Sequence, residues 1–153
     1  MKAVLCEQFG PPSSLVVKDV PSLQPGAGQV VVVVHAASVN FPDGLIIENK
    51  YQFKPQLPFS PGGEVAGTIL AVGPEVSGWA VGDRVIGVCS WGGFADEVLV
   101  DVRKLVRLPE GIAMDAASAL VITYGTTHYA LQVRGQLKPG ETLLVLGAAG
   151  GTG

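Results

Sequence analysis

The sequence has few charged residues and few aromatic ones. Only 15% of the 153 residues are charged, the formal net charge is −3, and Phe, Trp and Tyr together make up 7%. So little charge leaves no basic surface for nucleic acid or an anionic membrane, and neither is expected as a partner. The hydrophobic content of 48% is nevertheless high. Because a chain of this length buries roughly 70% of its unfolded surface, a globular fold with some apolar faces left for missing partners is expected.

Cysteine and long apolar runs are also scarce. Cys6 and Cys89 are the only two cysteines, too few for a disulfide framework or a cysteine metal cluster. Glycine, proline or a charge interrupts every apolar run before the roughly 18 residues that a membrane-spanning helix requires. The N-terminal stretch MKAVLCEQF is too short to be a secretory signal. A cytoplasmic protein is therefore expected.

What is abundant is glycine, with 21 residues, and proline, with 11. These residues divide the first two thirds into short segments, which favours strands and tight turns over a helical bundle. The five valines from Val30 to Val34 indicate a central strand covered on both faces. Gly67 marks a bulge or a close approach of two backbones. Strands are predicted at 1–8, 15–20, 30–34, 64–72, 85–89, 94–100 and 104–108. A short helix is predicted at 41–48 and a loop at 54–63. A mainly β, partly closed barrel is the fold that pairs so many short strands without exposed edges.

From Met114 onwards apolar residues recur at helical spacing. This predicts a helix as far as Tyr124, a break at Gly125, a second helical piece at 127–133 that Gly135 ends, and a strand at 142–146. The change from strands to a helix followed by a buried strand indicates a change of architecture. We place the domain boundary there, giving a first domain at 1–123 and a second, α/β unit at 124–153.

The chain ends in LLVLGAAGGTG, in which an apolar run enters three glycines spaced by three. This is how a dinucleotide-binding unit begins, because the glycines let the backbone approach a pyrophosphate. The following helix and the ribose-reading residue are absent. We therefore interpret the chain as an inactive fragment of a longer enzyme, with an unpaired strand that leads to self-association or a loosely held tail. The predicted cofactor-binding residues here are Gly147, Ala148, Gly150, Gly151, Thr152 and Gly153.

Four motifs in order resemble one family over nearly the whole chain: SVNFPDG at 38–44, YQFKPQLPFSPGGEVAGTILAVG at 51–73, VGDRV at 81–85 and the terminal LGAAGGTG. They resemble the quinone oxidoreductase (zeta-crystallin-like) branch of the medium-chain dehydrogenase/reductase superfamily. The resemblance implies a GroES-like catalytic domain followed by a Rossmann domain, with NADPH between them. It also implies reduction of quinones or activated alkenes by a homodimer of the full-length protein.

The resemblance also argues against zinc. Related zinc-dependent alcohol dehydrogenases have a cysteine ligand where this chain has Asn40 and a histidine ligand where it has Gly63. Catalytic zinc needs three side-chain ligands, so no metal is expected, and hydride chemistry is left to the cofactor. Two positions depart from the family pattern. Leu45 stands where many relatives have a tyrosine facing the cofactor, and Thr152 stands where valine is usual.

Three residues are predicted to be catalytic, and each has a structural alternative. Asn40 contacts the nicotinamide ribose or the substrate, or it caps the helix that follows. Tyr51 lines the substrate pocket, or it closes one end of the barrel. Thr127 contacts the nicotinamide carboxamide, as its position in the family pattern implies, or its hydroxyl caps a helix. For Glu64, pairing with arginine or backbone amides is favoured over acid–base chemistry.

The sequence leaves three functions open. The leading one is a zinc-free, NADPH-dependent reductase of quinones or enones. The second is reduction of an enoyl thioester, on coenzyme A or on a carrier protein. The third is an autonomous GroES-like binding or structural module that is not an enzyme.

Overall fold

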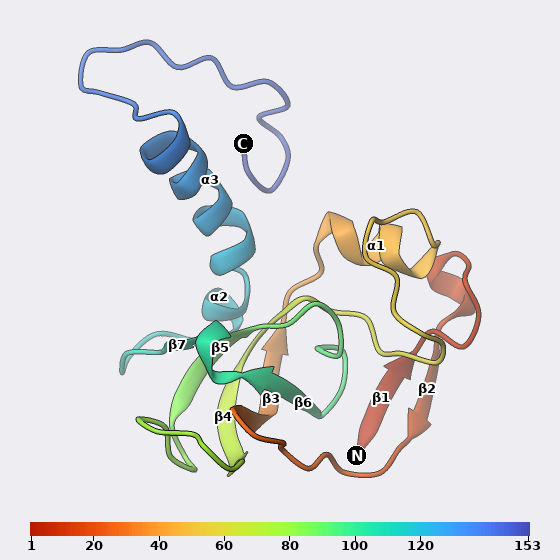
Figure 1. Ribbon diagram of the computed structural model, residues 1–153. Coiled ribbons are helices and arrows are strands. Elements are labelled where there is room, and N and C mark those ends of the chain that lie inside the picture. Colours follow the sequence, from red (N-terminus) through yellow and green to blue (C-terminus); the bar gives the residue numbers. More distant parts are fainter.

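The computed structural model describes all residues from 1 to 153. It contains seven strands and several short helices, shown in Figure 1. The strands are β1 (Lys2–Leu5), β2 (Val16–Asp19), β3 (Gln29–Ala37), β4 (Glu64–Val72), β5 (Arg84–Val88), β6 (Glu97–Asp101) and β7 (Leu105–Arg107). The helices are η1 (Pro12–Ser14), α1 (Phe41–Ile47), η2 (Val102–Lys104), α2 (Met114–Ser118), η3 (Val121–Gly125), α3 (Thr126–His128) and η4 (Tyr129–Arg134).

Five strands form one antiparallel sheet in the order β6-β3-β4-β5-β7, and β1 pairs with β2 in a separate hairpin. Isolated bridges from Ala3 to Ala95 and from Cys6 to Phe59 fasten the hairpin to the rest. The sheet is curled but does not close, since β6 and β7 are its two edges. The mainly β, partly closed barrel predicted from the sequence is confirmed.

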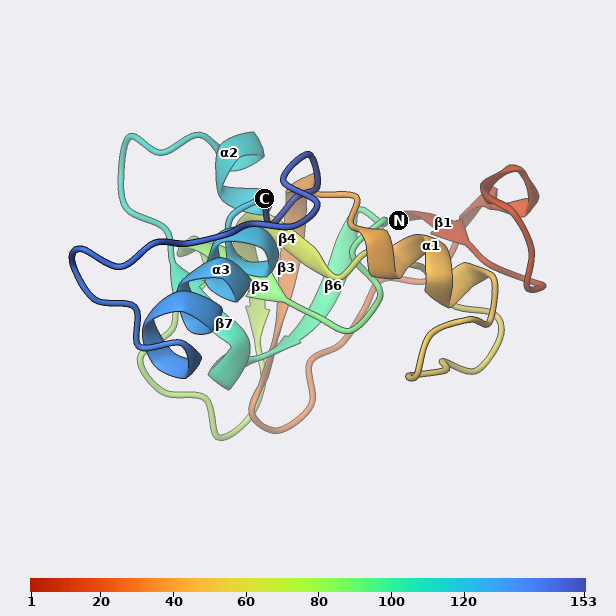
Figure 2. The same cartoon turned by 90° about the horizontal axis from the view of Figure 1, so that it is seen from above.

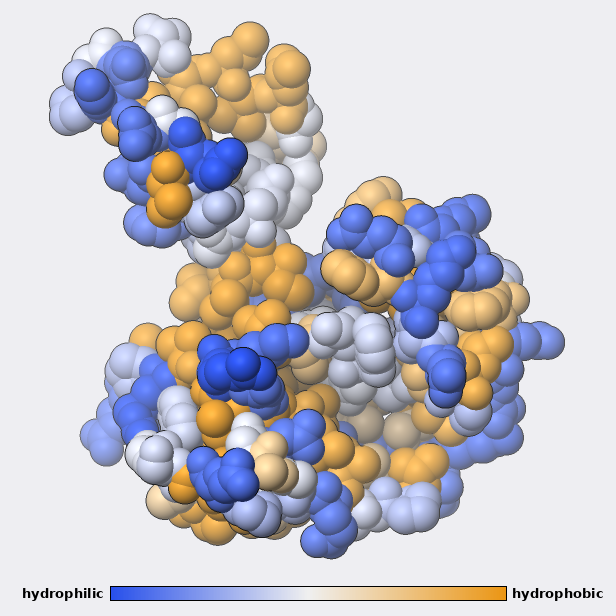
Figure 3. All heavy atoms as spheres, in the orientation of Figure 1, coloured by the Kyte–Doolittle hydropathy of each residue, from blue (hydrophilic) through white to orange (hydrophobic).

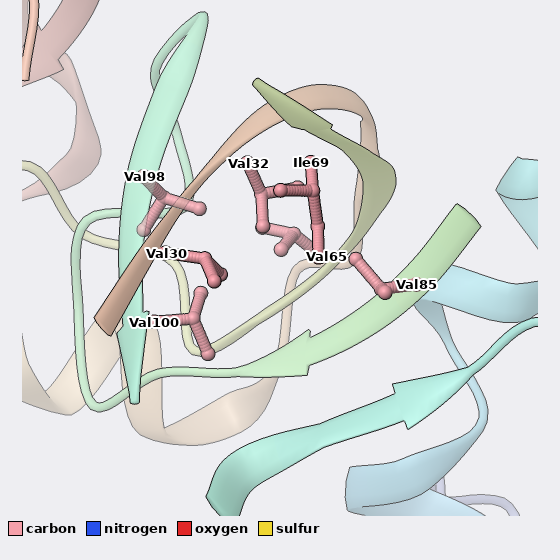
Figure 4. Packing of buried hydrophobic residues seen from close by; sticks show 7 residues of the cluster. All are labelled: Val30, Val32, Val65, Ile69, Val85, Val98 and Val100. Atoms are coloured by element: carbon pink, nitrogen blue, oxygen red, sulfur yellow. The ribbon is translucent and has the colours of Figure 1, made fainter. Parts of the chain in front are cut away.

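The valine run forms the centre of the sheet. Val30, Val31 and Val32 lie in β3 between β4 and β6 and are fully buried. Branched side chains from four strands point into the concave side, as Figure 4 shows. This cluster consists of Val30, Val32, Val65, Ile69, Val85, Val98 and Val100. The register between β3 and β4 shifts at two places, and Gly67 lies against the main chain of Val33, so the predicted close approach at this glycine is confirmed.

The helical part differs from the prediction in where it breaks. α2 stops at Ser118, and a second helical run then continues from Val121 to Arg134 straight through Gly125, whose φ of −62° and ψ of −41° are helical. The break expected at Gly125 is therefore wrong, because a glycine can stay helical when the residues on both sides do. Gly135 does end the run, as predicted. No helix of the protein combines the length and the apolar character that crossing a membrane demands.

The predicted strand at 142–146 does not form. Leu143 to Val145 have no regular secondary structure, Leu146 begins a turn, and all four are exposed, Leu146 to 85%. A strand needs a neighbour to satisfy its backbone groups, and this stretch has none. Seen from above in Figure 2, α3 lies on one side of the strands and α1 and the β1–β2 hairpin lie on the other, while the end of the tail comes back towards the strands. The division into domains at 123/124 stays a prediction.

Candidate functional site

A pocket of about 250 Å³ lies where α1, the start of β4 and the first turn of η3 meet. Figure 3 shows a notch in the surface between the lobe that carries α1 and the helical tail. Five of its ten lining residues are hydrophobic. The lining residues are Asn40, Pro42, Asp43, Ile46, Tyr51, Phe53, Gly63, Cys89, Ser90 and Ile122.

Asn40 stands at the N-terminus of α1 and also faces the pocket. It is the N-cap residue, and with Asp43 it forms a capping box. The backbone amide of Asn40 donates to Asp43 Oδ2 at 2.8 Å, while its side-chain Nδ2 donates to Ser38 Oγ at 2.9 Å. Asn40 therefore caps α1, the structural alternative, and it also lines the pocket. Its contact with the nicotinamide ribose or the substrate stays a prediction. Pro42 in the first turn suits the helix start, where its missing N–H is not needed.

Asp43 is a buried carboxylate that the sequence reasoning missed. Its side chain is 5% exposed, and besides Asn40 it accepts a bond from the amide of Gly62 at 3.2 Å. Burial raises the pKa of this carboxyl. The backbone amides of Asn40, Gly62 and Gly63 lower the pKa, but their effect is smaller than that of burial. The spacing Asn-x-x-Asp is the signal that could have identified it, since a capping box places an acidic residue three positions after the cap.

Tyr51 closes one side of the pocket. It packs against the buried cluster of Cys6, Ile46, Ile47 and Phe59, and its ring centre lies 6.0 Å from that of Phe53 at an angle of 60°. An aromatic pair in this tilted geometry is favourable and holds both rings in place. Tyr51 therefore lines the pocket and supports the core together.

Gly63 leaves room at the pocket floor. A Cβ built at this position would lie 3.4 Å from both Cys89 O and Ile122 Cδ1. Cys89 beside it donates its thiol to the carbonyl of Gly62 at 3.4 Å, and burial raises the pKa of Cys89 to about 12. Such a thiol stays protonated at neutral pH and is a poor nucleophile there. No group of three or more His, Cys, Asp or Glu side chains with metal-binding geometry occurs in the protein.

Glu64, directly after Gly63, is fully buried. Its carboxylate accepts a hydrogen bond from the backbone amide of Val121 and another from Ser38 Oγ at 3.3 Å. Pairing with backbone amides, the reading favoured from the sequence, is confirmed. Burial raises the pKa of Glu64, against the amides of Val121 and Ile122 and the hydroxyl of Ser38, which lower it.

This raised pKa predicts how pH acts on stability. The folded protein keeps the Glu64 proton over a pH range in which the unfolded chain has lost it, so the stability that this group contributes is complete below the ordinary glutamate pKa and falls as pH rises through the raised value. The Glu64→Gln variant has no such titration. We expect the free energy of unfolding of the wild type, relative to Glu64→Gln, to decrease steadily from pH 4 to pH 8 in urea titrations. A difference that stays flat or increases with pH would contradict this expectation.

The third predicted catalytic residue lies elsewhere. Thr127 does not line the pocket. Its hydroxyl donates to the carbonyl of Thr123 at 3.1 Å, one helical turn back, and lies 3.4 Å from the carbonyl of Thr152. Thr127 thus contacts the glycine-rich terminus, while Asn40 and Tyr51 face the pocket. Leu45 is not part of the pocket wall either.

The glycine-rich terminus forms a compact, exposed turn. Gly147 has a φ of +71°, the amide of Gly150 donates to its carbonyl at 3.0 Å, and a Cβ on Gly153 would lie 2.3 Å from Ala148 Cα. The backbone therefore folds back on itself in a way that requires glycine. Gly151 and Thr152 lie in the same exposed turn.

Comparisons with known proteins agree with this architecture. The family model described as the alcohol dehydrogenase GroES-like domain matches residues 26–110. Over 99% of the chain the sequence is 43% identical to the "Quinone oxidoreductase-like protein 2 homolog" of Nematostella vectensis, and over its whole length 38% identical to the quinone oxidoreductase of Homo sapiens. The chain covers 42% and 47% of those proteins, so it spans less than half the length of these relatives.

Two solved structures bear on function. Mycobacterial Rv1454c complexed with NADPH superposes with a TM-score of 0.91 at 32% identity, with 99% of this chain and 47% of that one covered. The CurK enoyl reductase superposes with a TM-score of 0.88 at 30% identity, with 99% and 48% covered. The chain belongs to the alcohol dehydrogenase GroES-like family, within the quinone oxidoreductase branch of the medium-chain dehydrogenase/reductase superfamily.

Proposed function

We propose that the complete protein is a zinc-independent, NADPH-dependent reductase of quinones or other electron-poor alkenes and carbonyls, and that this chain supplies its substrate pocket. The observation that carries the proposal is a pocket with an amide at Asn40 and only hydrogen at Gly63, in a chain related to quinone oxidoreductases. The donor set of this pocket does not fit zinc. Asn40 offers a neutral amide, Gly63 has no side chain and Asp43 is bonded to backbone amides, so the pocket lacks the three side-chain ligands that catalytic zinc needs.

NADPH supplies a hydride when bound, and the chain's own residues position what receives it. The apolar side chains of Ile46, Phe53 and Ile122 exclude water from one side of the pocket, and Asn40 and Tyr51 offer hydrogen bonds to a carbonyl oxygen. The turn at 147–153 supports a pyrophosphate site, because its glycines let the backbone approach closely. Homodimerisation and a cytoplasmic location of the complete protein remain part of this proposal.

The test uses the protein encoded by the complete reading frame. We expect it to oxidise NADPH with 1,4-benzoquinone and to contain no stoichiometric zinc after purification. Stoichiometric zinc that is needed for activity, or no turnover of any quinone or enone, would overturn the proposal. Similarity to the CurK enoyl reductase favours enoyl thioesters as a second substrate class. A much higher kcat/KM for crotonyl-CoA than for benzoquinone would identify that activity instead.

Asn40 provides the sharpest test of the pocket. Replacing it with alanine in the complete protein removes the side-chain amide, and we expect kcat/KM to fall about tenfold to hundredfold, the usual effect of losing one hydrogen bond in the transition state. Steady-state assays measure this well below the melting temperature, because loss of the N-cap also costs about 1 kcal/mol of stability. Gln52→Ala, an exposed polar residue beside Tyr51, is the matched control and should leave kcat/KM unchanged.

The 153-residue chain itself should bind NADPH poorly. The turn at 147–153 is exposed and no helix follows it to offer free amides to the phosphates. We expect a Kd weaker than about 10 μM by fluorescence titration. Affinity below 1 μM would favour the third possibility, a module that acts by itself.

A further inference from the structure

The helical run from 121 to 134 leaves the sheet and touches it only at its first turn. Figure 1 shows this helix projecting away from the sheet beyond α2. Val121 packs against the buried cluster of Ala66, Ile86, Leu108 and Ala117, and Ile122 lies over Gly63. Further along, Tyr124, Tyr129 and Val133 are more than half exposed. The direction of the helix is therefore decided where it starts.

Glu64 lies at that start. The first amides of a helix have no acceptor within the helix and carry partial positive charge. Glu64 Oε1 accepts from the first of them, Val121, and Glu64 Oε2 accepts from Ser38 Oγ. The backbone carbonyl of Glu64 also accepts from the amide of Ser38 at 3.3 Å. One side chain thus joins β4, the connection between β3 and α1, and the departing helix.

No cation accompanies this buried carboxyl group. Glu64 is fully buried, yet the five ion pairs of the protein, at Lys2, Lys18, Lys50, Arg103 and Arg107, all lie elsewhere. Burying a carboxylate without a cation is unfavourable unless hydrogen bonds replace the lost water. At Glu64 those bonds come from the helix start and from Ser38, so the position of the carboxylate and the position of the helix depend on each other.

We propose that Glu64 is a positioning residue that fixes the direction of the helix at 121–134 relative to the pocket, and with it the place of everything beyond Gly125. Ile122 is part of the pocket wall, so the same contact sets the shape of the pocket. This inference goes beyond the proposed function, since it holds for the chain whatever reaction the complete protein performs.

Distances between two spin labels test the proposal on the chain itself. One label is attached at Lys18→Cys in β2 and the other at Arg134→Cys at the end of η4, elements on opposite sides of Figure 1. Cys6 is buried and Cys89 has its pKa raised to about 12, so the native thiols do not react under mild labelling conditions. We expect a narrow distance distribution in the wild type and in Glu64→Gln, which keeps an acceptor oxygen. Glu64→Asp, which is too short to reach Val121, and Glu64→Ala should broaden it about twofold or more.

Controls separate positioning from general loss of structure. The near-ultraviolet circular dichroism of Trp79 and Trp91 reports on the sheet region and should stay native in every variant used. Asp101→Ala removes a hydrogen-bonded carboxylate at the end of another strand, β6, that bonds Arg103 and neither labelled element, and should leave the distribution unchanged. An unchanged distribution in folded Glu64→Asp and Glu64→Ala overturns the proposal, and so does equal broadening in Glu64→Gln.

Hydrogen exchange in the wild type tests the proposed role of Glu64 even if Glu64→Asp and Glu64→Ala fail to fold. If Glu64 holds the helix start, the Val121 amide should exchange roughly 100-fold or more slowly compared with an unstructured peptide. Exchange of the Val121 amide at the unstructured rate would overturn the proposal without any substitution.

Discussion

The Gly67→Ala variant is expected to lose about 3 kcal/mol or more of the free energy of unfolding, a large part of what a domain of this size has. A Cβ at this position would lie 2.0 Å from Val33 O and 2.8 Å from Val32 Cγ1. Val33 is in β3, the strand that pairs with β4 from Val30 to Ala37. A backbone carbonyl cannot move aside without separating the two central strands, so one methyl group disturbs the middle of the sheet. Urea unfolding followed by tryptophan fluorescence measures the loss.

Gly44→Ala is the matched control, because it is the same substitution in a different setting. Gly44 lies inside α1, and a Cβ there meets no atom within 4 Å. Alanine is favoured over glycine in a helix by about 1 kcal/mol, so this variant should be as stable as the wild type or slightly more so. Similar losses in both variants would mean that the close approach at Gly67 is not what limits the substitution.

The sequence predicted the sheet well because its signals are local. A run of β-branched valines indicates a buried central strand in any context, and the observed β3 extends the predicted 30–34 by only a few residues. The strand at 64–72 was predicted with its exact bounds because Gly63 and Gly73 flank it. The failures concern 142–146 and Gly125, where the outcome depends on neighbours. The stretch 142–146 lacks a strand to pair with. Gly125 lies inside a helical run that begins at Val121, so the break in the helix comes before Gly125.

The candidate site was predicted less completely. Asn40 and Tyr51 do line one pocket, but the roles given to them and to Thr127 remain predictions. Asp43 was missed although its capping-box spacing is visible in the sequence. The partner of Glu64 could not be identified beforehand, since Val121 lies 57 positions away and contributes a backbone amide, a group that every residue but proline has. Contacts of this kind follow from the fold, and the amino-acid type of the donor residue does not indicate them.

Asp43→Ala is the second substitution for which we expect a large loss, about 3 kcal/mol at pH 5. Asp43 is 5% exposed and accepts from the amides of Asn40 at 2.8 Å and Gly62 at 3.2 Å. Alanine leaves both donors without an acceptor, and it detaches the start of α1 from the loop that leads into β4. Because Asn40 lines the pocket and Gly62 directly precedes Gly63 in its wall, the pocket should deform together with the loss of stability. Unfolding in urea measures the loss, and thermal melting gives an independent value.

Asp19→Ala serves as the control for charge alone. Asp19 pairs with Lys2 at 3.2 Å on the surface, with its side chain 82% exposed, and its loss should cost less than about 1 kcal/mol.

The pH dependence of the Asp43→Ala cost distinguishes a buried carboxyl from a simple hydrogen-bond acceptor. Since burial raises the pKa of Asp43, its contribution is complete below the ordinary aspartate pKa and falls as pH rises through the raised value. The cost of Asp43→Ala should therefore shrink between pH 4 and pH 8. A cost that grows over this range would mean that the amide donors outweigh burial and that the ionised carboxylate is the form the fold prefers.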